Sequence, residues 1–122
     1  MNVVQRAQEG YSGVVRSDRS VEYQTIARVS HRLRQAALKR SSDFPTYVSA
    51  LHDNQKLWLA LASDVAHPDN ELPSELRAGI FYLAEFTEHE TRRLMRGEGD
   101  VAALIDINAA VLMGLRAGEG KE

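Results

Sequence analysis

Long blocks with the period of an α-helix, interrupted by few helix breakers, are the feature that most constrains this chain. Its three prolines stand at positions 45, 68 and 73. Between them, apolar residues recur every three or four positions, which is the spacing of one helix face. No block shows the apolar–polar alternation that is typical of a β-strand. The sequence therefore predicts an all-α fold.

Capping residues and helix breakers divide these blocks into four helices. Ser17 and Asp18 are good N-caps for the first helix, and Asp100 is a good N-cap for the last. Pro45 suits the first turn of the second helix, where a missing N–H costs nothing. The expected helices are residues 17–40, 44–65, 73–96 and 100–115. Short connections favour antiparallel neighbours, so we expect a small bundle of four helices.

The chain of 122 residues is expected to form a single domain. Residues 1–16 are interpreted as a short N-terminal arm, either helical or partly ordered, with Val3, Val4 and Tyr11 along one side. Residues 117–122 are polar and are interpreted as a flexible tail.

Residues at helical spacing predict which faces meet in the core. Asn54 and Asn108 lie within these faces although they are polar. A buried asparagine needs hydrogen-bond partners, so Asn108 is interpreted as a structural bridge. The other residues expected on inner faces are Ile26, Val29, Leu33, Ala36, Phe44, Val48, Leu51, Trp58, Leu61, Val65, Leu76, Ile80, Leu83, Thr87, Leu94, Val101, Leu104, Ile105, Val111, Leu112 and Leu115.

No combination of residues predicts an active site or a metal centre. The chain has no cysteine, which excludes thiolate metal sites, disulfides and cysteine nucleophiles. Asp64 and His67 have helical ligand spacing, but the pair occurs once and is interpreted as a solvated helix end. Glu85, Glu88 and Glu90 are interpreted as a solvated, salt-bridged face. We therefore expect a protein that is not an enzyme and that holds no metal or cofactor.

The distribution of apolar residues predicts a cytoplasmic protein. The longest strictly apolar run, residues 57–62, is six residues long, whereas a membrane span needs about 20. The first residues lack the apolar stretch of a secretory signal.

Charge is unevenly distributed along the chain. Residues 16–40 carry seven basic and two acidic side chains, and residues 43–90 carry nine acidic and two basic ones. A basic first helix can hold RNA phosphates through Arg28, Arg32 and Lys39. The competing interpretation, which we favour, is that this helix packs beside the acidic helices and is neutralised there.

The helices carry more apolar residues than a narrow stripe requires. Residues 57–62, 80–83 and 104–107 place large apolar side chains at consecutive positions, which cannot all face the same way. Three explanations stay open: a homodimer seam, a groove for a partner helix, or burial on several sides.

Three specific segments occur in order along the chain: residues 54–58 (NQKLW), 68–78 (PDNELPSELRA) and 104–108 (LIDIN), the last leading into 113–115 (MGL). With these segments the chain resembles the FlaF family of flagellar biosynthesis regulators. The similarity covers nearly the whole chain. The basic region 15–20 departs from the family pattern.

The resemblance implies a non-catalytic cytoplasmic protein that acts with flagellin, promoting its synthesis or escorting it for export and filament assembly. It also implies work alongside the translational regulator FlbT. Flagellin has amphipathic terminal helices, which a groove in a bundle can cover. RNA binding through the basic helix is the alternative. The candidate partner-binding residues are Asn54, Leu57, Trp58, Asp69, Asn70, Pro73, Asp106 and Asn108.

Overall fold

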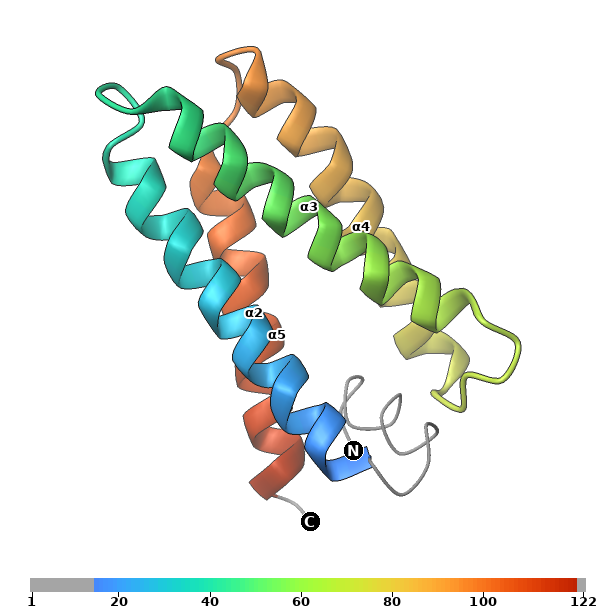
Figure 1. Ribbon diagram of the computed structural model, residues 1–122. Helices are drawn as coiled ribbons and strands as arrows, with labels where there is room; N and C mark the ends of the chain where they lie inside the picture. The colour runs from blue at the N-terminus through green and yellow to red at the C-terminus, as the bar shows by residue number, and fades with distance from the viewer. Residues whose placement is uncertain (1–14, 121–122) are drawn as a thin grey trace.

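Four α-helices make up the part of the chain that the computed structural model describes, residues 15–120 with side chains from 23 to 114 (Figure 1). They are α2 (Val15–Leu38), α3 (Phe44–Ala66), α4 (Ser74–Met95) and α5 (Val101–Gly120). No strand occurs in these residues. The all-α prediction is confirmed. Residues 1–14, which hold most of the predicted arm, lie outside the described residues, as do residues 121–122.

The helices run antiparallel in chain order. Figure 1 shows α2 beside α5 and α3 beside α4, with turns 39–43 and 96–100 at one end and loop 67–73 at the other. α3 packs extensively on both α4 and α2, and α5 packs mainly on α2. The contact between α5 and α4 is much lighter. The bundle is therefore packed less tightly between α4 and α5 than between the other neighbouring helices.

Side chains close the helix ends as their chemistry predicts, with two differences in position. Asp100 accepts a hydrogen bond from the backbone N–H of Ala102 (2.9 Å), so the predicted cap of α5 is confirmed. α2 begins at Val15, so the expected caps Ser17 and Asp18 are wrong and lie inside its first turn. α5 continues to Gly120, past the predicted end at residue 115, because no proline interrupts it.

Two apolar clusters fill the bundle. The loop-side cluster lies toward loop 67–73 and consists of Ile26, Trp58, Leu61, Val65, Leu72, Ile80 and Ala84. The turn-side cluster lies toward the two turns and consists of Leu33, Ala36, Ala37, Tyr47, Ala50, Leu51, Leu94 and Leu104. Most of the predicted inner-face residues with described side chains belong to these clusters or pack against them.

Two predicted core residues are instead exposed. Phe44 is 49% exposed and Leu76 is 39% exposed. Both lie in the first turn of a helix, at an end of the bundle where few neighbouring side chains cover them. Phe44 makes a tilted ring contact with Tyr47, whose centroid lies 5.9 Å away.

Glu90 joins α4 to the start of α5. Glu90 is 5% exposed, so its interpretation as part of a solvated face is wrong. One carboxylate oxygen accepts from Arg93 (3.0 Å) and the other from the backbone N–H of Asp100 (3.3 Å). For Glu88 the salt-bridged interpretation is confirmed, since it pairs with Arg92 at 3.2 Å.

Gly99 lets the chain pass close to this buried carboxylate. Its φ is +79°, and a Cβ atom there would lie 2.4 Å from Glu90 Oε2. We expect Gly99→Ala to lower the free energy of unfolding by about 2–3 kcal/mol, from backbone strain plus displacement of Glu90. Gly97→Ala is the matched control, because its φ is +80° with nothing within 4 Å. In urea denaturation, Gly97→Ala should lower the free energy of unfolding by only about 1 kcal/mol. Equal losses for both variants would contradict the role of Glu90.

Among the helices of the described residues, none combines the length and the apolar character needed to cross a membrane.

Candidate functional site

A chain of buried hydrogen bonds links α3 to α5 through the core. The indole N–H of Trp58 donates to Asn108 Oδ1 (2.9 Å), and Asn108 Nδ2 donates to Asn54 Oδ1 (2.7 Å). Asn54 and Asn108 are fully buried and Trp58 is 2% exposed. The interpretation of Asn108 as a structural bridge is confirmed. In this conformation the three side chains contact the rest of the bundle and lie beyond the reach of a partner.

The two asparagines belong to a layer of buried polar residues, one from each described helix. We call Ser30, Asn54, Thr87 and Asn108 the polar layer. At 1.5 Å per residue, they lie roughly 10–15 Å from the turn-side ends of their helices, and so at a similar level, where the two apolar clusters adjoin. Ser30 Oγ, Asn54 Nδ2 and Thr87 Oγ1 have no hydrogen-bond partner among the described residues.

The other candidate partner-binding residues lie apart from the hydrogen bonds that join Trp58, Asn108 and Asn54. Leu57 is half-buried against the loop-side cluster, and Asp106 is exposed on α5. Asn70 organises loop 67–73, because its amide donates to Asp64 O (3.0 Å) and its oxygen accepts from the N–H of Leu72 (3.0 Å). Asp69 and Pro73 are exposed on the same loop. The structure thus joins three of the eight candidates by hydrogen bonds and places three others on loop 67–73. Leu57 and Asp106 lie apart from both groups, on α3 and α5.

Apolar side chains are left half-buried where α4 and α5 pack lightly. Leu83 and Phe86 lie on the side of α4 that carries Glu90, which contacts the start of α5. On α5, Ile107 and Val111 lie one turn apart on the side toward α4, as helix handedness requires. Three of these four side chains pack against the loop-side cluster, and Phe86 packs against the turn-side cluster. We call the four residues the α4–α5 seam.

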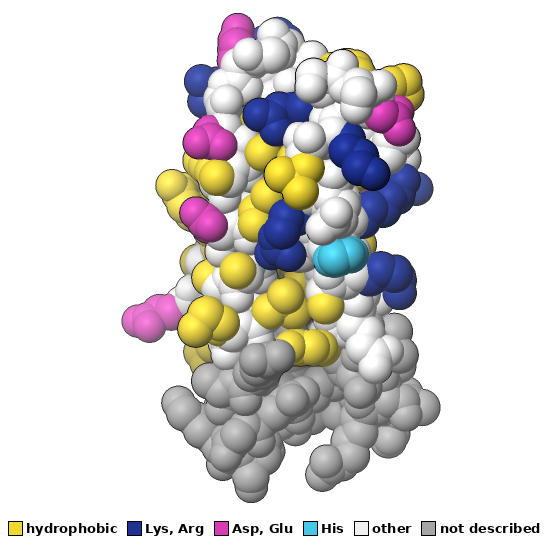
Figure 2. Space-filling model, turned by 90° about the vertical axis from the view of Figure 1, so that its left-hand side faces the viewer, with side chains coloured by type: hydrophobic (Ala, Val, Ile, Leu, Met, Phe, Trp, Pro, Cys, Tyr) yellow, Lys and Arg dark blue, Asp and Glu magenta, His cyan; other side chains and the backbone are white. Residues whose placement is uncertain are grey.

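Basic side chains gather on the face of the molecule to which α2 contributes, interspersed with apolar ones (Figure 2). Arg28 and Lys39 are exposed. Arg32 forms an ion pair with Asp53 of α3 and donates to Ser49 Oγ (3.0 Å). The expectation that acidic helices neutralise the basic one is therefore confirmed for Arg32.

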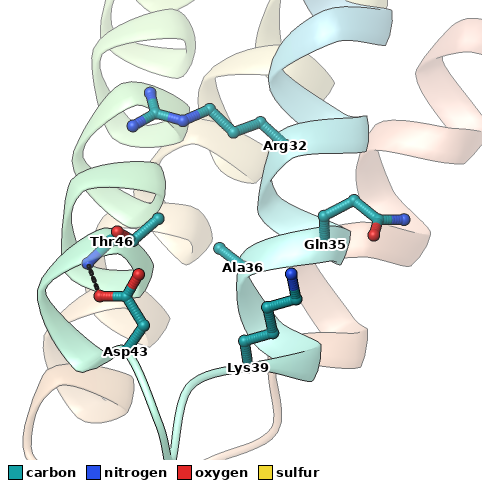
Figure 3. A pocket seen from close by; sticks show the side chains of 6 residues that line it. All are labelled: Arg32, Gln35, Ala36, Lys39, Asp43 and Thr46. Atoms are coloured by element: carbon teal, nitrogen blue, oxygen red, sulfur yellow. Dashed lines mark hydrogen bonds between the residues drawn. The ribbon is translucent and has the colours of Figure 1, made fainter.

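A shallow pocket between α2 and the start of α3 brings two of the candidate RNA-binding residues together. Arg32 and Lys39 line it with Gln35, Ala36, Asp43 and Thr46 (Figure 3). Asp43 accepts from the N–H of Thr46 (3.3 Å) and so caps the start of α3. Because carboxylates accompany both cations, the pocket has little surplus charge for an anion. Arg28 does not line this pocket.

The Tyr47 phenol is an ionisable group within the turn-side cluster. Burial raises the pKa of the Tyr47 phenol; nearby Arg40 lowers it, and Asp100 raises it further. Within residues 23–114, whose side chains are described, His, Asp and Glu form no group that can hold a metal ion.

The sequence analysis did not identify Ser30 and Thr87 as buried polar residues of one layer. It placed Thr87 on the inner face of α4, but the sequence does not indicate whether its hydroxyl finds a hydrogen-bond partner. Ser30 stands four residues after Ile26 and three before Leu33, so helical spacing alone can place it inside. Because serine and threonine are also common on helix surfaces, their presence at a position does not indicate whether that position is buried.

Comparison with known proteins gives one result. The family model described as flagellar protein FlaF matches residues 5–115, which include the three segments that carry the resemblance and all or most of each described helix. Neither the curated proteins nor the solved structures contain a match to the chain. The extent of the family match shows that this chain belongs to the FlaF family of flagellar proteins.

Proposed function

We propose that this protein binds unassembled flagellin in the cytoplasm and promotes its synthesis, export and assembly into the filament. Membership of a flagellar family supports this proposal. The observation that carries it is the α4–α5 seam, where light helix packing leaves Leu83, Phe86, Ile107 and Val111 half-buried. An amphipathic helix laid along such a seam buries its own apolar face and completes the burial of these side chains.

The energetics favour a helical partner. Burial of apolar surface contributes about 25 cal/mol per Å², so completing the burial of four large side chains is a substantial driving force. Asp106 lies on the exposed side of α5, near the seam and not within it. A polar rim around an apolar centre is the usual organisation of a protein interface. The protein contributes binding surface to this function, with no chemical step.

The first test is size-exclusion chromatography with light scattering on this protein, alone and mixed with flagellin monomer from the same organism. A complex of defined mass is the expected result, and two separate peaks at micromolar concentration would contradict the proposal. The run on the protein alone also decides whether it is a homodimer.

A pair of variants on α5 locates the surface. Val111→Glu places a charge in the seam, whereas Met113→Glu, two residues away, changes a side chain that is 70% exposed. We expect the first change to weaken flagellin binding by at least about tenfold, which is ~1.4 kcal/mol, and the second to leave it nearly unchanged. Isothermal titration calorimetry measures both affinities. Circular dichroism confirms that the variants are folded, with Val111→Ser available as a milder substitution. Equal effects at both positions would place the interface elsewhere.

RNA binding by the basic face of α2 is the second candidate, because Arg28 and Lys39 are exposed on it. It predicts binding of flagellin message that falls steeply with salt, as counterions are released from the phosphates. Arg28→Gln, Arg32→Gln and Lys39→Gln together should abolish that binding. The flagellin proposal predicts weak salt dependence, since apolar burial is its main driving force.

A further inference from the structure

The polar layer contains three buried polar atoms that make no hydrogen bond within the part of the chain whose side chains are described. Ser30, Asn54 and Thr87 are 3%, 0% and 1% exposed, and their Oγ, Nδ2 and Oγ1 atoms have no partner among the described residues. A buried polar atom without a hydrogen bond destabilises the state that buries it. When the core opens, water satisfies the same atom. The layer therefore narrows the free-energy gap between the closed bundle and an opened one.

Helix α5 is the element that such an opening moves most easily. It packs mainly on α2 and only lightly on α4. Its polar links across the core are the two hydrogen bonds of Asn108, which water can replace. Of its apolar side chains, Leu104 near its start is fully buried, whereas Ile107 and Val111 farther along are half-buried. Glu90 fixes only its first turn, through the N–H of Asp100. α5 can therefore pivot at turn 96–100, so that its later turns move away from α4.

We propose that the polar layer is a built-in weak point at which α5 separates from α4, exposing the α4–α5 seam to an incoming amphipathic helix. The proposal rests on the proposed function for the identity of that helix, a terminal segment of flagellin. The opening of α5 itself is a property of the protein alone. Its test can therefore succeed or fail whether or not flagellin binds.

Hydrogen exchange on the full chain measures the opening directly. The wild-type amides of α5 between residues 104 and 114 are expected to exchange faster than those at the centre of α3, because they are released by a partial opening. If α5 and α3 exchange at the same rate, through global unfolding only, the proposal is overturned.

Thr87→Val tests whether the polar layer causes the opening. The change keeps the side chain's shape and removes the unpaired hydroxyl, so it should slow exchange in α5 about tenfold. Thr91→Val is the matched control on the same helix. Thr91 is equally buried, at 1% exposed, but its hydroxyl donates to Thr87 O (2.6 Å). The Thr91→Val change should therefore not slow hydrogen exchange in α5. Indistinguishable effects of the two changes would overturn the proposal.

Flagellin binding then separates this inference from the proposed function. If opening precedes binding, the apparent dissociation constant rises as the open population falls, so Thr87→Val should weaken flagellin binding by the same factor as it slows exchange. Unchanged affinity in this variant would overturn the access role of the opening. If wild-type protein binds no flagellin while Thr87→Val still slows exchange in α5, the proposed function fails and the opening device stands.

Discussion

Replacing Trp58 by alanine is expected to lower the free energy of unfolding by about 3–5 kcal/mol, the usual range for removing a large aromatic side chain from a core. Trp58 is 2% exposed and packs in the loop-side cluster. Its removal leaves a cavity and also deprives Asn108 Oδ1 of its donor. A loss of this size is a large part of the stability of a domain of this length.

Urea denaturation followed by circular dichroism measures the effect. Trp58→Phe is the control, because it keeps most of the aromatic volume while it removes the indole N–H. It should cost about 1–3 kcal/mol, the penalty for one unpaired buried acceptor plus a small change in packing. A Trp58→Ala protein that stays as stable as wild type but fails to bind flagellin would contradict the core role and assign Trp58 to the interface.

Asn108→Leu is expected to be nearly as damaging, with a loss of about 2–5 kcal/mol, although leucine is the more hydrophobic residue. The change leaves both the Trp58 N–H and the Asn54 amide oxygen buried without partners. Each unpaired group costs about 1–3 kcal/mol. An apolar substitution at this core position is destabilising because the Trp58 N–H and the Asn54 amide oxygen remain buried after Asn108 is removed.

The double variant Asn54→Leu/Asn108→Leu provides the control for Asn108. Of the hydrogen bonds that join Trp58, Asn108 and Asn54, the double variant leaves a single unpaired group, the Trp58 N–H. The double variant should therefore be more stable than the sum of the two single losses predicts, by about 1 kcal/mol or more in a double-mutant cycle. Simple additivity of the two losses would contradict the hydrogen-bonded chain.

Much of the fold could be predicted from the sequence, because local chemistry determines where the helices begin and end. Asp100 is an effective cap wherever a helix follows it, and Pro45 is tolerated only in a first turn. Spacing also identified the buried stripes. It failed at Phe44 and Leu76, since periodicity gives the side of a helix but not how far the neighbouring helices extend.

The interior of the candidate site was harder to predict, because its contacts join distant segments. The apolar surroundings of Asn108 in the sequence were enough to predict that it is buried and forms a bridge. They could not predict its partners, Trp58 and Asn54, which are 50 and 54 positions away. Spacing within one helix carries no information about how two helices are oriented relative to each other. Glu90 was misinterpreted for the same reason: its partner Asp100 is on another element.

The position of Trp58 has a practical consequence. It is the only tryptophan in the chain, and its indole lies in the core with its N–H bonded to α5. The emission of an indole shifts to longer wavelength when water reaches it. The protein thus carries an intrinsic fluorescent reporter at the point where α3 and α5 meet, and stopped-flow fluorescence can follow their separation in real time without any added label.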